Sequence, residues 1–145
     1  PRGLGGRVRL LGQVPEATLG RLYRGADLFV MPNVPVPGDI EGFGVVMLEA
    51  GLCGLPVLAA DLEGIRGVVR EGESGHLVPS RDAAAFAEVV LRHHADRAAL
   101  ARASASAARH VADTFSWGSV AEQYLAVLRS GTRDAATRPR RAAAP

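Results

Sequence analysis

Short apolar runs and longer helix-like stretches alternate along this chain. The apolar runs cover residues 8–11, 28–31, 56–60 and 76–78, and each is followed at once by glycine, proline or aspartate. Such short runs, without alternating polar positions, are typical of strands that are buried on both faces of a sheet. We therefore predict four strands.

The stretches between and after these runs have the periodicity of helices. The predicted helices begin at Pro15-Glu16 and then cover residues 45–52, 64–70, 83–94, 97–111 and 117–129. The last three follow Asp82, Asp96 and Ser116, which are residue types that cap helix N-termini. Strands that alternate with helices imply right-handed crossovers and a parallel sheet. The predicted fold is therefore α/β, half of a doubly wound parallel sheet with flanking helices.

One loop in this arrangement is suited to bind an anion. Doubly wound sheets bind ligands at the carboxyl ends of their strands, which selects the loops after the second and third predicted strands. The first of these, residues 33–44, ends in Gly42, Phe43 and Gly44, directly before the predicted helix 45–52. Free N–H groups at a helix N-terminus favour phosphate, and the glycines let a ligand approach the backbone. A diphosphate is the expected ligand.

Two glutamates flank this glycine turn. Glu41 lies in the loop, whereas Glu49 lies on the order of 7 Å along the predicted helix from Gly44, at 1.5 Å per residue. This spacing leaves room for a phosphate between two carboxylates, each of which can accept two hydrogen bonds from vicinal sugar hydroxyls. Because its neighbours are apolar, Glu49 either needs a partner on a buried helix or faces solvent on a helix packed by its other sides. The sequence leaves both alternatives open.

Charge argues against a nucleic-acid partner. All 17 basic residues are arginine, and the overall net charge is +2. Residues 131–145 hold four arginines against one aspartate, a net charge of +3. Residues 1–130 therefore carry a net charge of −1, which is +2 minus +3. We predict one domain over residues 1–130 and a disordered basic tail over residues 131–145. The tail leaves two alternatives open, solvated disorder and peripheral contact with anionic lipid at the inner face of the membrane.

Other features suggest a cytoplasmic piece of a longer protein. The chain begins at Pro1 without a methionine or a signal-peptide pattern, and its apolar runs are shorter than the roughly 18 residues of a membrane span. Cys53 is the only cysteine, so it cannot form an internal disulfide, and its apolar surroundings favour a buried core position. We expect a cytoplasmic location.

Glu41-Gly42-Phe43-Gly44, seven intervening residues and Glu49-Ala50 together resemble the pattern of glycosyltransferase family 4. The resemblance covers roughly residues 7 to 129, and its further segments are Leu11-Gly12, Leu22-Tyr23, 26–32, 54–57, 63–65, 72–79 and Phe115-Ser116-Trp117. It implies the C-terminal, Rossmann-like half of a GT-B fold, in which a nucleoside-diphosphate sugar lies between two domains. It also implies a retaining transferase that moves a hexosyl group to an acceptor.

The resemblance also implies a role for each matching residue. Glu41 matches the glutamate beside the transferred sugar, and Gly42, Phe43 and Gly44 match the turn that faces sugar and phosphate. Val45 would give a helix N-terminal N–H to the diphosphate, and Glu49 would accept hydrogen bonds from the ribose hydroxyls. No metal or cofactor is expected, because catalysis would come from positioning and charge stabilisation.

This chain departs from the family pattern in two ways, so other functions remain open as alternatives. The family places an arginine and a lysine on the diphosphate, yet this chain has no lysine, so that segment is expected upstream, together with the N-terminal acceptor domain. The isolated chain is therefore expected to bind donor weakly and to transfer nothing. The alternatives are a non-catalytic nucleotide-sugar-binding module and a fragment of a GT-B epimerase or phosphorylase.

The remaining chemistry-bearing residues are expected to fill structural roles. His93 and His94 point about 100° apart on a helix, so they cannot share a metal, and His76 and His110 lie in unrelated segments. Trp117 is expected to anchor the last helix by packing.

Overall fold

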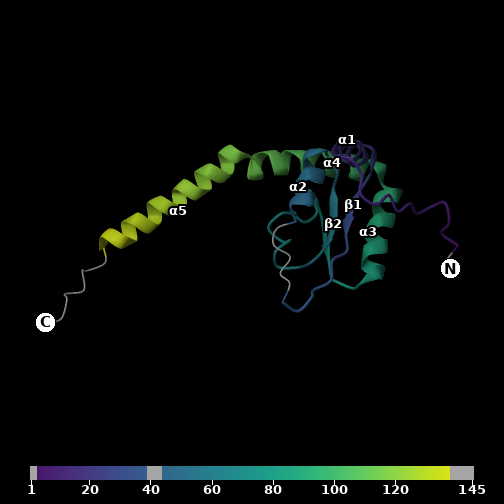
Figure 1. The fold of residues 1–145 in the computed structure, drawn as a ribbon, viewed down its shortest axis with the longest axis horizontal. Coiled ribbons are helices and arrows are strands. Elements are labelled where there is room, and N and C mark those ends of the chain that lie inside the picture. Colours follow the sequence, from purple (N-terminus) through teal and green to yellow (C-terminus); the bar gives the residue numbers. More distant parts are fainter. Residues whose placement is uncertain (1–2, 39–43, 138–145) are drawn as a thin grey trace.

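A three-stranded parallel sheet forms the centre of the protein (Figure 1). The computed structural model describes residues 3–38 and 44–137, with side chains up to residue 130. The strands are β1 (Phe29–Met31), β2 (Val57–Ala60) and β3 (Gly75–Val78), in the spatial order β1-β2-β3. Phe29 pairs with Val57, which in turn pairs with Gly75. The parallel sheet and three of the four predicted strands are confirmed.

Both faces of β2 are buried, as its uninterrupted apolar run predicts. Val57 and Ala59 pack on one face with Met47 of helix α2 (Val45–Leu52) and with the turn that contains Ile65. The other face, formed by Leu58 and Ala60, packs against helix α3 (Ala83–Ala95) through Phe86 and Val89. The helices α2 and α3 accordingly lie on opposite sides of the sheet in Figure 1.

The helices begin close to the predicted residues. They are α1 (Glu16–Gly25), α2 (Val45–Leu52), α3 (Ala83–Ala95), α4 (Arg97–Phe115) and α5 (Trp117–Thr137). Asp82 accepts a hydrogen bond from the Ala85 N–H at 2.9 Å, and Asp96 accepts one from the Ala99 N–H at 2.8 Å. These caps confirm two of the predicted N-termini.

Two predicted elements do not form. Residues 8–11 have no regular secondary structure and are exposed, with Leu10 95% exposed. Within residues 3–38 and 44–137 no strand lies beside them to form a ladder of hydrogen bonds. Residues 64–70 form turns with bonds such as Val68 N–H to the Ile65 carbonyl, 3.0 Å, in place of the predicted helix. Gly64 and Gly67 explain this difference, since glycine weakens a short helix.

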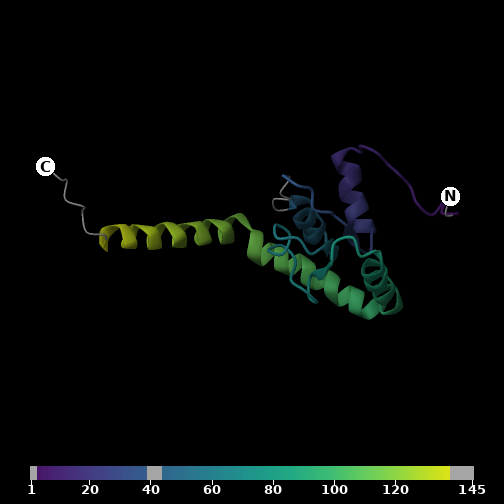
Figure 2. The same ribbon diagram turned by 90° about the horizontal axis from the view of Figure 1, so that it is seen from below.

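The last helix leaves the body of the protein. Figures 1 and 2 show α5 as an arm that projects away from the sheet. It continues to Thr137, past the predicted end at Arg129, and residues 138–145 lie outside the described residues. The tail predicted over residues 131–145 stays a prediction. Trp117 is 91% exposed, so the prediction that it anchors the helix by packing is wrong.

Candidate functional site

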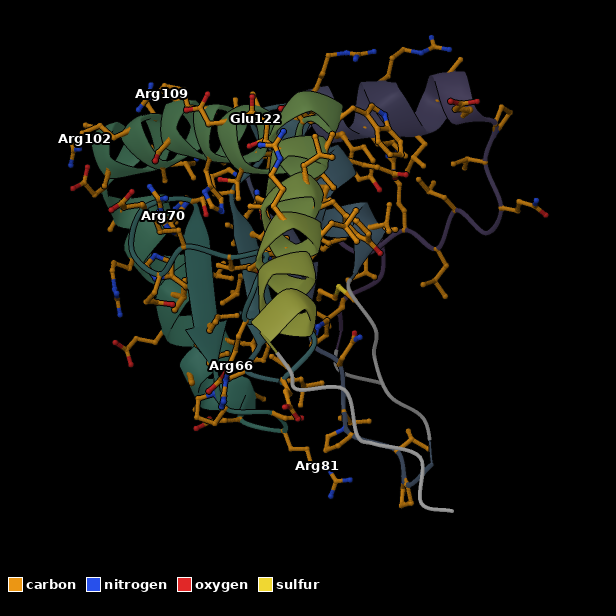
Figure 3. All side chains as sticks on the ribbon, turned by 90° about the vertical axis from the view of Figure 1, so that its left-hand side faces the viewer. Arg66, Arg70, Arg81, Arg102, Arg109 and Glu122 are labelled. Atoms are coloured by element: carbon orange, nitrogen blue, oxygen red, sulfur yellow. The ribbon has the colours of Figure 1, made fainter. Side chains whose placement is uncertain are left out.

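The carboxyl edge of the sheet brings three loops together. Ser80, after β3, donates a hydrogen bond from its hydroxyl to the Asn33 carbonyl, after β1, at 2.8 Å. Asp61, after β2, accepts two hydrogen bonds from the Arg66 guanidinium at 2.5 and 3.0 Å, and this pair lowers the pKa of Asp61. Arg66 and Arg81 lie at this end of the molecule in Figure 3. At the predicted ligand-binding edge one hydrogen bond thus joins the loops after β1 and β3, and the Asp61–Arg66 pair lies within the loop after β2.

Helix α2 starts from a backbone conformation that favours glycine. Gly44 precedes the helix with φ 61° and ψ 54°, in the left-handed region. A Cβ at this position would collide with the terminal methyl of Met47, whose side chain is only 1% exposed. No side chain in the described part of the chain caps this helix. The Met47 N–H donates to the Gly44 carbonyl at 2.8 Å, whereas the Val45 and Val46 N–H groups come too early in the helix for an intrahelical acceptor. Such an N-terminus suits an anionic ligand.

Glu49 faces the surface and has a tyrosine as its partner. The Tyr23 hydroxyl of α1 donates a hydrogen bond to Glu49 Oε2 at 3.3 Å. Burial, followed by the charge of Glu49 and this hydrogen bond, raises the pKa of Tyr23 above its ordinary value of 10.0. The Tyr23 ring also meets Phe29 of β1 edge-on, with 5.9 Å between centroids. These contacts hold the hydroxyl beside the carboxylate.

The sequence interpretation of α2 as a buried helix is only half right. Met47, Ala50 and Gly51 are buried, whereas Val45 is 59% exposed and Glu49 lies on the exposed side. The second alternative for Glu49, solvent exposure on a helix packed by its other sides, is therefore the correct one. The reason is geometric: α2 packs on the sheet and on α4 and leaves a third face open.

A cleft of about 640 Å³ lies between α1 and α2. Its walls are formed by Glu16, Ala17, Leu19, Gly20, Tyr23, Arg24, Glu49 and Cys53. Cys53 is half-buried on this wall, so the prediction of a buried core cysteine is wrong. Tyr23 was missed as a site residue, although the family pattern includes Leu22-Tyr23. The cleft places Glu49 on the wall of an open groove in which a ligand could contact it.

Three of the predicted site residues lie outside the described residues. These are Glu41, Gly42 and Phe43, whose assigned roles stay predictions. The other three, Gly44, Val45 and Glu49, are brought together on α2. The structure thus describes the helical part of the predicted site and the cleft beside it.

Two histidines meet far from this edge, which corrects the expectation that they belong to unrelated segments. The rings of His76 on β3 and His93 on α3 lie 5.1 Å apart between centroids. Burial, followed by the neighbouring His76 and Arg92, lowers the pKa of His93 from its ordinary value of 6.5. His93 is buried whereas His94 is exposed, so adjacent histidines do diverge as predicted.

Known proteins resemble this chain over most of its length. A model of the family described as Glycosyl transferases group 1 matches residues 1–96. Phosphatidyl-myo-inositol mannosyltransferase of Mycobacterium leprae is 40% identical over 131 residues, which cover 88% of this chain and 33% of that protein. D-inositol 3-phosphate glycosyltransferase 1 of Catenulispora acidiphila is 39% identical over 137 residues, which cover 94% of this chain and 31% of that protein.

Solved structures agree with these sequence matches. The structure of Anabaena Alr3699/HepE in complex with UDP-glucose superposes with a TM-score of 0.72 at 27% identity, covering 88% of this chain and 34% of that one. The chain thus spans about a third of the length of the relatives that it matches. No helix in the described part of the chain is long and apolar enough to cross a membrane.

Proposed function

Because this chain belongs to the glycosyl transferases group 1 family, we propose that it forms the donor-binding half of a retaining glycosyltransferase. Its parallel sheet with flanking helices is the corresponding part of a GT-B fold, as predicted. The whole enzyme would transfer a hexosyl group from a nucleoside-diphosphate sugar to an acceptor on the remaining part of the protein. The observation that carries this proposal is the alignment along α2 of the Glu49 carboxylate and a helix N-terminus that no side chain in residues 3–38 and 44–130 caps.

The donor is proposed to lie along this helix. Its diphosphate would accept hydrogen bonds from the first N–H groups of α2, at Val45 and beyond, where the helix dipole favours negative charge. Glu49 lies five residues after Gly44, or about 7.5 Å along the helix axis. This offset suits a ribose next to a diphosphate. The cleft between α1 and α2 then takes the nucleoside end of the donor.

Tyr23 is proposed to orient Glu49 for this role. Its hydroxyl occupies one acceptor position of Glu49 Oε2 and leaves the other carboxylate oxygen for ribose. Two vicinal hydroxyls donate well to one ionised carboxylate, because such charge-assisted hydrogen bonds are stronger than neutral ones. Tyr23 of α1 and Glu49 of α2 would thus form the part of the cleft that contacts the nucleoside.

Glu41 is proposed to act at the sugar end. Glu41 precedes the glycine turn in the sequence and Glu49 follows it, so a diphosphate bound at the turn would have one glutamate on each side of it in the sequence. Its carboxylate would hold sugar hydroxyls and stabilise the positive charge that develops at the anomeric carbon, while the leaving diphosphate helps to deprotonate the acceptor. The relatives named for inositol-containing compounds suggest an inositol-type acceptor, held by the other domain.

Replacing Glu49 tests the nucleoside assignment. In the 145-residue chain, titrated with UDP or UDP-glucose and followed by ligand-observed NMR, Glu49→Gln is expected to weaken binding about 10- to 100-fold. The reason is that a hydrogen bond to a charged group contributes ~1.5–3 kcal/mol. Glu122→Gln on the exposed arm α5 removes the same charge outside the residues that line the cleft and serves as the matched control. Equal affinities for both variants would refute the assignment.

Replacing Glu41 tests the proposed reaction. In the full-length parent protein, Glu41→Gln is expected to reduce kcat by about 10²–10³, the effect of removing one transition-state contact, with donor affinity changed much less. Glu49→Gln should instead act mainly on KM for the donor. Sugar transfer would be followed by the release of nucleoside diphosphate. The opposite pattern, a loss of donor affinity with kcat preserved in Glu41→Gln, would contradict the proposed roles.

A further inference from the structure

The cleft between α1 and α2 carries a negative and a positive side chain on its α1 side. Glu16 is the first residue of α1, Arg24 lies in its last turn, and both line the cleft. Among the side chains that the structure describes, neither of these two takes part in an ion pair. Both charged groups are therefore available to a ligand.

The Arg24 guanidinium points back along α1 toward Glu16. A Cβ added to Gly20 would lie 3.3 Å from Arg24 Nη2, so the guanidinium lies beside Gly20. Gly20 follows Glu16 by four residues, or about 6 Å along the helix axis at 1.5 Å per residue. Residues four apart share one face of a helix. The two charged groups thus stand along one side of the cleft, about one helical turn apart.

Small and apolar residues lie between the two charges. Ala17, Leu19 and Gly20 line the same side of the cleft, and Gly20 has no side chain to project into it. A planar base can lie with its face on such a surface while its edges reach the charged groups. An apolar surface with a few polar groups is typical of small-molecule sites.

The inference that follows rests on the proposed function, in which Glu49 holds the ribose of the donor. The Tyr23 hydroxyl donates to Glu49 at 3.3 Å, and Tyr23 lies seven residues after Glu16, about 10.5 Å along α1. A purine base joined to a ribose spans a comparable distance. The base would therefore extend from Glu49 past Gly20 toward the beginning of α1.

We propose that Glu16 and Arg24 select guanine, so that the donor is a guanosine-diphosphate sugar. Guanine presents two adjacent N–H donors, at N1 and at the N2 amino group, which match the two oxygens of the Glu16 carboxylate. Its O6 and N7 acceptors match the paired N–H groups of the Arg24 guanidinium. Guanine thus satisfies both charged groups at once.

The other common bases match this pair of charges less well. Uracil has one N–H between two carbonyl oxygens, so it offers a carboxylate a single hydrogen bond. Adenine has the N6 amino group as its only donor on the exposed edges. The solved structure of Anabaena Alr3699/HepE holds UDP-glucose, so uracil is the competing base for the experiment.

Titration of the 145-residue chain with GDP, UDP and inosine diphosphate tests the choice of base. By ligand-observed NMR, GDP is expected to bind at least about tenfold more tightly than UDP, because each hydrogen bond to a charged group contributes a factor of that order. Inosine diphosphate differs from GDP only by the missing N2 amino group and should bind about tenfold more weakly than GDP. All three nucleotides share the ribose and the diphosphate, so these differences report on the base.

Substitutions assign the preference to the two side chains. Glu16→Gln should weaken GDP binding at least about tenfold, change UDP binding by less than about twofold, and remove the discrimination between GDP and inosine diphosphate. Arg24→Gln should weaken GDP and inosine diphosphate equally, because both carry O6 and N7. Arg21→Gln is the matched control on the same helix. Arg21 does not line the cleft and bonds to the Ala17 carbonyl, so this variant should bind GDP as the parent chain does.

The outcomes separate the choice of base from the donor-binding function. UDP binding as tight as GDP binding, or a preference for GDP that persists in Glu16→Gln, would overturn the guanine assignment and leave the proposed function intact. Equal losses of GDP and UDP affinity in Glu16→Gln would overturn it too. If none of the three nucleotides binds, the proposed function fails and the guanine assignment fails with it.

Discussion

Replacing Gly75 with alanine is expected to cause the largest loss of folding stability of any glycine replacement in this chain. Gly75 begins β3 and pairs with Val57 of the central strand β2. A Cβ at this position would overlap the Val57 carbonyl oxygen and would lie 3.0 Å from the Val57 N and carbonyl C. Backbone atoms in the middle of a sheet cannot move aside without breaking the β2–β3 pairing. We expect a loss of more than ~3 kcal/mol from a total of about 5–15 kcal/mol.

Circular dichroism and urea unfolding measure this loss. Gly67→Ala is the matched control, because a Cβ there meets no atom within 4 Å and its φ does not lie in the left-handed region. The control should change the free energy of unfolding by no more than about 0.5 kcal/mol. If Gly75→Ala were as stable as Gly67→Ala, the close approach of β2 and β3 would be wrong.

The sheet could be predicted because its signal is local. Residues 56–60 form an uninterrupted apolar run, and burial on both faces is what such a run requires. The caps Asp82 and Asp96 are also local, since each side chain bonds to an N–H group three residues later. Sequence reading succeeds where the deciding partner is a near neighbour in the chain.

The sequence predictions that failed depend on partners that are distant in the sequence. Residues 8–11 have the composition of a strand, but a strand also needs a neighbour, which composition does not reveal. The hydroxyl of Tyr23 reaches Glu49 across 26 positions, and His76 meets His93 across the interface between β3 and α3. Spacing rules act within one helix or strand, so they could not bring these pairs together.

For the candidate site, the sequence predicted the helix that the structure shows, but it did not predict the face of the cleft that Tyr23 of α1 forms beside Glu49. The glycine turn predicted the start of α2 at Val45, and the structure agrees. The cleft depends on how α1 lies beside α2, which is decided by packing between elements and not by any motif. The exposure of Glu49, which the sequence left open, has the same origin, because it depends on which face of α2 the sheet and α4 cover.

Replacing Gly44 with alanine is expected to cause the second large loss of folding stability. Comparison with alanine at another glycine separates the cost of the backbone conformation from the cost of the side-chain collision. The left-handed conformation costs an alanine about 1–2 kcal/mol. The new Cβ also collides with the methyl of Met47, which packs in the core with Val57 and Ala59, and such overpacking costs about 1–3 kcal/mol. The expected total is ~2–5 kcal/mol by urea unfolding.

Gly72→Ala isolates the backbone part of this loss. Gly72 also has a positive φ, 74°, but a Cβ there meets nothing within 4 Å, so this variant should lose only about 1–2 kcal/mol. The difference between the two variants measures the contact between Gly44 and Met47. Since Gly44 also sets the direction in which the loop enters α2, its alanine variant should bind UDP more weakly at temperatures where it remains folded, whereas Gly72→Ala should bind UDP normally. Equal stability and equal UDP affinity in the two variants would mean that Gly44 neither packs on Met47 nor shapes the phosphate end of the site.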